Sequence, residues 1–279
     1  MAKKIFIILI GVCLAPLFTF AQLWEVGVLL GASTYSGDLT PGLIDPKQIH
    51  PDGGVLVRAN INRYFTVKGN VYYGTISGND EDATNPKDRQ RNLNFKSHIL
   101  DISVNGEINL LGFESNTRYY KTQYKTSPYL FGGVAVFNFD PEGYDPVTNS
   151  WVRLQPLGTE GQGTTRYNDR QKYALTQISI PFGFGLKHNL SEHWNIGFEF
   201  GWRKTFTDYL DDVSNTYVPN QYLSQFSGAL AARMAIGNNP LNKDYGDNVN
   251  RGNPNTDDWY MIGGITITYI ILAPYCPHF

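Results

Sequence analysis

Apolar and polar side chains alternate most regularly in the segment 194–206, WNIGFEFGWRKTF. As an extended strand, the segment puts its aromatic and apolar side chains on one face, namely Trp194, Ile196, Phe198, Phe200 and Trp202. The opposite face carries two glycines together with Glu199 and Arg203. Strands of soluble sandwiches also alternate, but they rarely place two Trp and two Phe opposite charges of both signs. The pattern predicts a strand whose apolar face contacts lipid and whose polar face lines a narrow lumen, as in an outer-membrane β-barrel.

The same period of two residues recurs along the chain and predicts eight strands. Their expected ranges are 23–33, 53–62, 65–76, 95–109, 128–139, 173–188, 194–206 and 258–271. Short and long connections alternate between them, which is typical of bacterial barrels with short periplasmic turns and long extracellular loops. We therefore expect an all-β fold, an eight-stranded antiparallel transmembrane β-barrel over residues 22–272. The alternative is a secreted β-sandwich, which also has many short strands but points its aromatic side chains inward.

The inward-facing positions of the predicted strands collect charges of both signs. The cations are Arg58, Lys68, Lys187 and Arg203, and the anions are Glu25, Asp101, Glu107 and Glu199. Side chains fill the interior of a barrel with eight strands, and an isolated buried ion costs several kcal/mol. We expect these four cations and four anions to form ion pairs that close the lumen, which argues against a diffusion pore.

The first residues have the pattern of a secretory signal peptide. Lys3 and Lys4 precede an apolar run over 5–20, and Thr19 and Ala21 place small side chains before a cleavage site near Ala21. The alternative, an uncleaved anchor, is disfavoured because a spanning helix needs about 18 apolar residues. The sequence thus predicts a signal peptide over 1–21 and an integral protein of the outer membrane. At the other end, Pro274 and Pro277 predict a periplasmic tail over 273–279, which carries Cys276.

Composition excludes some functions and leaves others without support. The formal net charge is −2, so nothing indicates the basic surface that nucleic-acid binding needs. None of the five histidines has the spacing of a metal-binding helix or a nucleophile elbow. A lipid-modifying barrel enzyme therefore has no support beyond the presence of Ser and His, and we expect no catalytic residues and no cofactor.

The segment TDYLDDV offers the one candidate metal site, with Asp208, Asp211 and Asp212 as hard oxygen ligands for Ca²⁺. It lacks the glycine turn and the terminal Glu of an EF-hand loop. Arg203 and Lys204 lie just before it. We therefore favour a salt-bridged barrel rim over a metal site.

The last long loop contains one helical stripe, in which Tyr222, Phe226, Leu230 and Met234 recur every four residues. This spacing predicts one short helix. Packing over the barrel mouth is the simpler interpretation, and a helix that binds a partner is the alternative.

The turn between the fourth and fifth strands is the longest of the expected periplasmic turns. Its basic and aromatic side chains are Arg118, Tyr119, Tyr120, Lys121, Tyr124 and Lys125. Protein interfaces favour Tyr and Arg, so the turn is a candidate partner contact. A solvated turn without a partner is the equal alternative.

Two segments, FGWRKTFTDYLDDVSNTYV and RGNPNTDDWYMIGGITITY, resemble the PorG-like (DUF6089 type) outer-membrane proteins of Bacteroidota, which are associated with type IX secretion. The resemblance implies an OmpA-like barrel that is not an enzyme. It also implies an anchor or adaptor of the secretion and gliding machinery, in contact with a periplasmic ring that is built from a lipoprotein and its partner. The alternative is a passive barrel that stabilises the envelope or binds a surface ligand.

Overall fold

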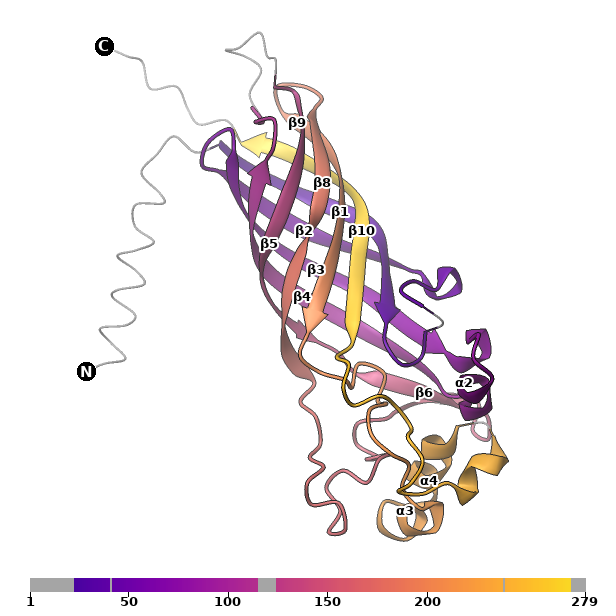
Figure 1. The fold of residues 1–279 in the computed structure, drawn as a ribbon. Coiled ribbons are helices and arrows are strands. Elements are labelled where there is room, and N and C mark those ends of the chain that lie inside the picture. The colour runs from indigo at the N-terminus through magenta and orange to yellow at the C-terminus, as the bar shows by residue number, and fades with distance from the viewer. Residues whose placement is uncertain (1–22, 41, 115–123, 238, 272–279) are drawn as a thin grey trace, which may run out of the picture.

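The computed structural model describes residues 23–40, 42–114, 124–237 and 239–271. Eight long strands form its wall, and they are β1 (Leu23–Ser36), β2 (His50–Asn60), β3 (Phe65–Asn79), β4 (Asn94–Asn109), β5 (Thr126–Asn138), β8 (Thr176–Asn189), β9 (Trp194–Thr205) and β10 (Trp259–Ile271). Each strand pairs antiparallel with its neighbours, and pairing of β10 with β1 closes the cylinder seen in Figure 1. The predicted eight-stranded antiparallel barrel is confirmed. The strand bounds differ from the expected ones by three residues at most, because the period of two continues to the strand ends.

The barrel wall separates an apolar outer surface from a polar interior. Outward side chains such as Leu30, Val55, Val104 and Val134 are exposed in the isolated chain, whereas the inward neighbours of each are buried or are glycine. An exposed apolar belt of this kind contacts lipid in outer-membrane barrels. None of the helices in the described ranges is long and apolar enough to cross a membrane.

The two ends of the barrel differ in size. Short turns connect β2 to β3 and β8 to β9, at the end of the barrel where β1 begins and β10 ends. The connections 37–49, 80–93, 139–175 and 206–258 gather at the other end. By the usual orientation of such barrels, the short turns face the periplasm and the long connections face outward. We call these four connections the cap.

The cap has its own secondary structure. Its elements are η2 (Pro46–Gln48), η3 (Asp80–Asp82), α2 (Pro86–Arg91), β6 (Pro141–Asp145), β7 (Ser150–Arg153), α3 (Asn220–Phe226), α4 (Ala229–Ile236) and η4 (Pro240–Asp244). Strand β6 pairs with β4 and so extends the barrel sheet into the cap. Cap residues Leu39, Leu154 and Met234 belong to the same buried apolar cluster as Tyr35 and Phe137 of the barrel. One hydrophobic core therefore continues from the upper lumen into the cap.

The segment 79–92 is rich in charge and has no apolar periodicity, so the sequence predicts a solvated loop there. This prediction is wrong, because the segment contains η3 and α2 and buries an ion pair. Asp80 is buried, and Arg91 donates to both of its carboxylate oxygens at 2.7 and 2.8 Å. The Arg91 guanidinium also donates to the backbone oxygens of Asp38 and Arg251. Charges that satisfy each other can be buried without any apolar periodicity, so the pattern gives no signal for this contact.

The single helix expected in the last loop is also wrong, because two helices occupy the region. Helix α3 ends before Gly228, whose backbone has φ +94°. That conformation suits glycine and interrupts a right-handed helix. Phe226 of the predicted stripe is 56% exposed, whereas Leu223 is buried. The rings of Tyr222 and Phe226 instead contact each other, with centroids 4.4 Å apart and planes tilted by 31°.

Candidate functional site

The lower half of the lumen is filled by an ion network. Glu107 accepts from Arg58 Nε at 3.1 Å and from Lys187 Nζ at 2.8 Å. Glu199 accepts from Lys68 Nζ at 2.5 Å and from the Tyr129 hydroxyl at 2.8 Å. The lumen network, as we call it, comprises three cations and three carboxylates, namely Arg58, Lys68, Lys187, Glu25, Glu107 and Glu199.

Arg58 is the centre of the lumen network. Its guanidinium lies within 4 Å of all three carboxylates, at 3.1 Å from Glu107, 3.7 Å from Glu199 and 3.8 Å from Glu25. Glu25 has further donors in Asn60 Nδ2 at 2.7 Å and Thr268 Oγ1 at 2.9 Å. Since every carboxylate has a cation and hydrogen-bond donors, the network offsets much of the cost of burying its charges.

The other two lumen charges lie nearer the cap. Arg203 Nε is 3.7 Å from Asp101, which also accepts from the Tyr260 hydroxyl at 2.7 Å. The structure therefore places all eight sequence-predicted lumen charges inside the barrel, in two groups. Glu199 and Arg203, which share a face of β9, belong to different groups.

Aromatic and aliphatic side chains fill the lumen around and above Asp101 and Arg203. Tyr72, Ile76, Phe95, Phe137 and Ile262 are all buried there, in the core that continues into the cap. The opening left beside Asp101, Tyr72 and Tyr260 measures only about 10 Å³. Ions and side chains together seal the barrel along its length.

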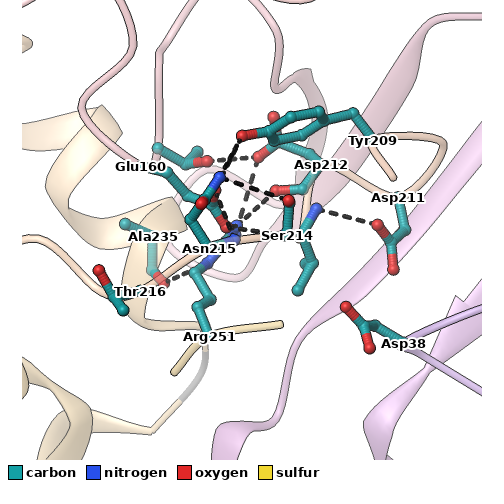
Figure 2. A network of polar contacts seen from close by, with 12 residues as sticks. Asp38, Glu160, Tyr209, Asp211, Asp212, Ser214, Asn215, Thr216, Ala235 and Arg251 are labelled. Atoms are coloured by element: carbon teal, nitrogen blue, oxygen red, sulfur yellow. Dashed lines mark hydrogen bonds and ion pairs between the residues drawn. The ribbon is translucent and has the colours of Figure 1, made fainter. Parts of the chain in front are cut away.

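A second polar network holds the cap together around Arg251, as Figure 2 shows. Arg251 donates to Glu160 at 3.1 Å and to the backbone oxygens of Asp212 and Ala235. Glu160 also accepts from the backbone nitrogens of Ser214 and Asn215 at 2.9 and 3.0 Å. The cap network, as we call it, ties the connection between β5 and β8 to the connection between β9 and β10.

The three aspartates of TDYLDDV do not converge on one point. Asp212 accepts from Tyr173 at 2.7 Å and from Thr159, and it faces Arg251, whereas Asp211 lies 2.7 Å from the Tyr35 hydroxyl. Asp208 is half-buried. Within the described ranges, no group of three or more His, Cys, Asp or Glu side chains is arranged to hold a metal ion. The basic partner of this segment is Arg251, a residue that the sequence pattern did not single out.

Burial gives the cap carboxyls unusual proton affinity. It raises the pKa of Asp212 to about 6, and Arg251 opposes the shift. Burial likewise raises the pKa of Asp208 to about 8, with nearby Asp38 and Glu160 adding to the effect. Desolvation also lifts the pKa values of Asp211 and Asp258 well above the usual range.

Asp211 and Asp258 approach the same hydroxyl. The Tyr35 oxygen lies 2.7 Å from one carboxylate and 2.8 Å from the other. A hydroxyl has only one hydrogen to donate, so a protonated carboxyl on one side completes the arrangement. Burial and the shared Tyr35 hydroxyl together favour the protonated form of one of these two carboxyls.

A known sequence family matches most of this chain. The family described as a domain of unknown function, DUF6089, covers residues 3–234. This chain belongs to the DUF6089 family. The matched range runs from before β1 to within α4, so it includes the lumen network and most of the cap. No curated protein shows significant sequence similarity to this DUF6089 chain.

Several solved outer-membrane proteins share the barrel fold of the DUF6089 chain at low sequence identity. Ail of Yersinia pestis is 8% identical with a TM-score of 0.42, over 90% of this chain and all of Ail. The N-terminal barrel of Pseudomonas aeruginosa OprF is 9% identical with a TM-score of 0.37, over 90% of this chain and 98% of that domain. Neisserial surface protein A is 9% identical with a TM-score of 0.38, over 88% of this chain and 96% of that protein's chain. The similarity of the DUF6089 chain to these proteins concerns the barrel fold alone.

The candidate partner turn of the DUF6089 chain lies partly outside the described residues, including Arg118, Tyr119, Tyr120 and Lys121. At its described end, the Arg63 guanidinium lies 5.4 Å from the Tyr124 ring centroid and 4.8 Å from that of Tyr64. Lys125 is exposed beside them. Arg63, on the neighbouring turn, is a member of this surface that the sequence pattern did not identify.

Proposed function

We propose that this protein is a non-enzymatic anchor in the outer membrane for the type IX secretion and gliding machinery. In this proposal the barrel contacts a periplasmic ring, built from a lipoprotein and its partner, through the turn that contains Arg118 to Lys125. The sequence resemblance alone supplies the link to secretion, because the DUF6089 family is described as a domain of unknown function. The single observation that carries an anchoring role is the sealed lumen.

A sealed lumen favours a function at the surface of the barrel over transport of solutes through the lumen. Arg58, Lys68 and Lys187 are at most 1% exposed, and each lies within 4 Å of a buried carboxylate. A conducting channel would require these pairs to separate inside a low-dielectric interior, which is costly. The faces left for function are therefore the lipid-facing wall, the periplasmic turns and the cap.

The periplasmic face carries a surface that suits a protein partner. Arg63, Tyr64, Tyr124 and Lys125 lie together at the periplasmic end, with Tyr64 40% exposed. Tyr and Arg are enriched in interfaces because they combine apolar area with hydrogen bonding. Arg118, Tyr119, Tyr120 and Lys121 belong to the same turn by sequence and lie outside the described residues.

The test is replacement of Arg118, Tyr120 and Lys121 by Ser in the native membrane. All three lie between the end of β4 and the start of β5 in the sequence, so the heat-dependent gel mobility of the barrel should stay that of the parent. Co-purification of the ring lipoprotein and its partner should fall at least several-fold, and secretion should fall with it. The control is Leu190→Ser with Ser191→Ala in the turn between β8 and β9, which changes the same periplasmic end without touching the basic surface.

The cap offers a second candidate function, recognition of a surface ligand. A polar cavity of about 700 Å³ opens among Asp38, Lys87, Gln90, Tyr217, Tyr245 and Asn253, a volume within the range of small-molecule sites. Changing Lys87, Gln90 and Tyr245 to Ala provides the opposing arm of the test. If this cap variant loses secretion while the turn variant keeps both its partners and secretion, the functional contact lies at the cell surface and the periplasmic proposal fails.

A further inference from the structure

The lipid-facing wall has a groove of about 430 Å³ across β1, β10 and β9. At its middle, Ala32 of β1 pairs with Gly263 of β10, which in turn pairs with Phe200 of β9. Ala32 and Gly263 project at most one methyl group from the wall. The neighbouring outward positions on β1 and β10 are larger, with Leu30 and Ile265 on the periplasmic side of this row.

The cap forms the outer edge of the groove. Ile44 and Ile49, from the connection between β1 and β2, line it together with the barrel residues. Met261 and Thr34 are only 1% and 6% exposed, although both occupy outward-facing positions of their strands. Ile44 and Ile49 remain 41% and 45% exposed. The connection therefore overhangs the wall and leaves an apolar space between itself and the strands.

A cation lies on the same wall, toward the cap from the groove. Thr34, Met261 and Trp202 form the first outward row above Ala32 and Gly263. Trp259 and Lys204 pair in the next row, about 7 Å further along the strands. The Lys204 ammonium lies 5.9 Å from the Trp259 ring centroid, and in the described part of the chain no carboxylate comes within ion-pair distance of it.

We propose that this groove binds one acyl chain of an outer-leaflet lipid, whose phosphate group is held by Lys204. We call it the wall site. The groove is continuous with the apolar belt that contacts the bilayer, so a hydrocarbon chain enters it without leaving the membrane. Lipid tails are as apolar as Leu, so the gain is close packing against Phe200 and Met261 and not the hydrophobic effect. The phosphate adds attraction to an ammonium at the membrane surface.

The wall site does not depend on the proposed role in secretion. It predicts that the purified full-length protein retains one lipid when it is taken from bilayers of phosphatidylcholine, phosphatidic acid and diacylglycerol into detergent. Native mass spectrometry counts the bound lipid and identifies it. Phosphatidic acid should exceed diacylglycerol among the retained molecules at least fivefold, because only the former carries a phosphate.

Two variants separate the groove from the cation. Ala32→Phe fills the groove and should lower retention of both lipids at least fivefold. Lys204→Gln leaves the groove open, so it should keep acyl-chain retention and lose the preference for phosphatidic acid. The matched control is Val134→Phe, which adds a ring at an exposed outward position of β5. All variants are compared only after each shows the heat-dependent mobility of a folded barrel.

The lipid retention of these variants tests both parts of the wall site, the groove and the cation. Parental retention in Ala32→Phe, or an equal loss in Val134→Phe, overturns the wall site. A preference for phosphatidic acid that survives Lys204→Gln overturns the role of Lys204 in holding the phosphate. If Ala32→Phe does not fold, the smaller Ala32→Leu is used with Val134→Leu as its control, and the same readings apply.

Discussion

The two buried polar networks of this molecule balance their charges differently. In the lumen network, three cations face three carboxylates, and Arg58 contacts all three acids. In the cap, Arg91 and Arg251 are surrounded by an excess of acids, which are Asp38, Asp80, Glu160, Asp208, Asp211, Asp212 and Asp258. A balanced network stays satisfied with every group ionised. In an acid-rich network, protonation relieves the repulsion between buried carboxylates, so we expect the cap to respond to pH more than the lumen network does.

The largest effect on stability is expected when a substitution removes the charge balance of the lumen network. Arg58→Met deletes the cation that Glu25, Glu107 and Glu199 share, and leaves buried carboxylates with less compensation. Loss of one partner from a buried pair costs roughly 3 to 5 kcal/mol. Unfolding in urea, followed by the gel mobility of the folded and unfolded forms, should show a loss of this size in the free energy of unfolding.

The control for this change is Lys47→Met in the cap. Lys47 pairs with Asp82 at 2.5 Å, but its side chain is 73% exposed, and exposed pairs contribute under about 1 kcal/mol. If Arg58→Met and Lys47→Met unfold at the same urea concentration as the parent, the lumen charges are solvated and the barrel is not sealed.

An intermediate effect should follow from pH, and it should be larger in the cap than in strands β4 and β9. Burial raises the pKa of Asp212 from the ordinary 3.8 to about 6, and that of Asp208 to about 8. Because the folded cap binds these protons more tightly than the unfolded chain, their stabilisation is complete below the unfolded value. It is lost as the pH rises through about 6 and then about 8. The cap should therefore lose stability as the pH rises from about 4 to about 8.

Hydrogen exchange measures this loosening. After correction for the intrinsic dependence of exchange on pH, amides of 206–258 should exchange several-fold faster at the alkaline end, whereas amides of β4 and β9 should not change. Asp212→Asn, which mimics the protonated carboxyl, should reduce the dependence. Equal acceleration in cap and barrel, or slower exchange of the cap at high pH, would contradict the proposed proton-dependent cap.

The sequence reveals the barrel far better than the cap, for a physical reason. In a strand, side chains alternate between lipid and lumen, so the face to which Glu199 and Arg203 belong can be read from neighbours two residues away. The cap is held by contacts between distant segments, such as Arg251 with Glu160, which are 91 residues apart. Such pairs leave no periodic signal. The sequence does bring Asp212 to attention, but it points to Arg203 and Lys204 as its partners instead of Arg251.

The break between α3 and α4 shows the same limit at the level of the backbone. The spacing of Tyr222, Phe226, Leu230 and Met234 fits one helix, and only the conformation of Gly228 prevents it. A single Gly inside a helical pattern costs only about 1 kcal/mol relative to Ala. That cost is too small to mark an interruption, so the spacing alone predicts one continuous helix.

The smallest effect is expected from Gly228→Ala, which tests whether this backbone break is required by the cap. No atom lies within 4 Å of the added Cβ, so crowding does not oppose the change. The backbone, with φ +94° and ψ 163°, lies in a region that is essentially restricted to glycine, and occupying it with another residue costs on the order of 1 kcal/mol or more. Exchange of α3 and α4 amides should therefore rise about fivefold or more, with the barrel unaffected.

Gly246→Ala is the matched control, since that glycine has no positive φ and its added Cβ would meet Pro219 only at 3.5 Å. If Gly228→Ala exchanges as slowly as Gly246→Ala, the two helices can join without loss, and the cap does not need the break that separates it from the predicted single helix.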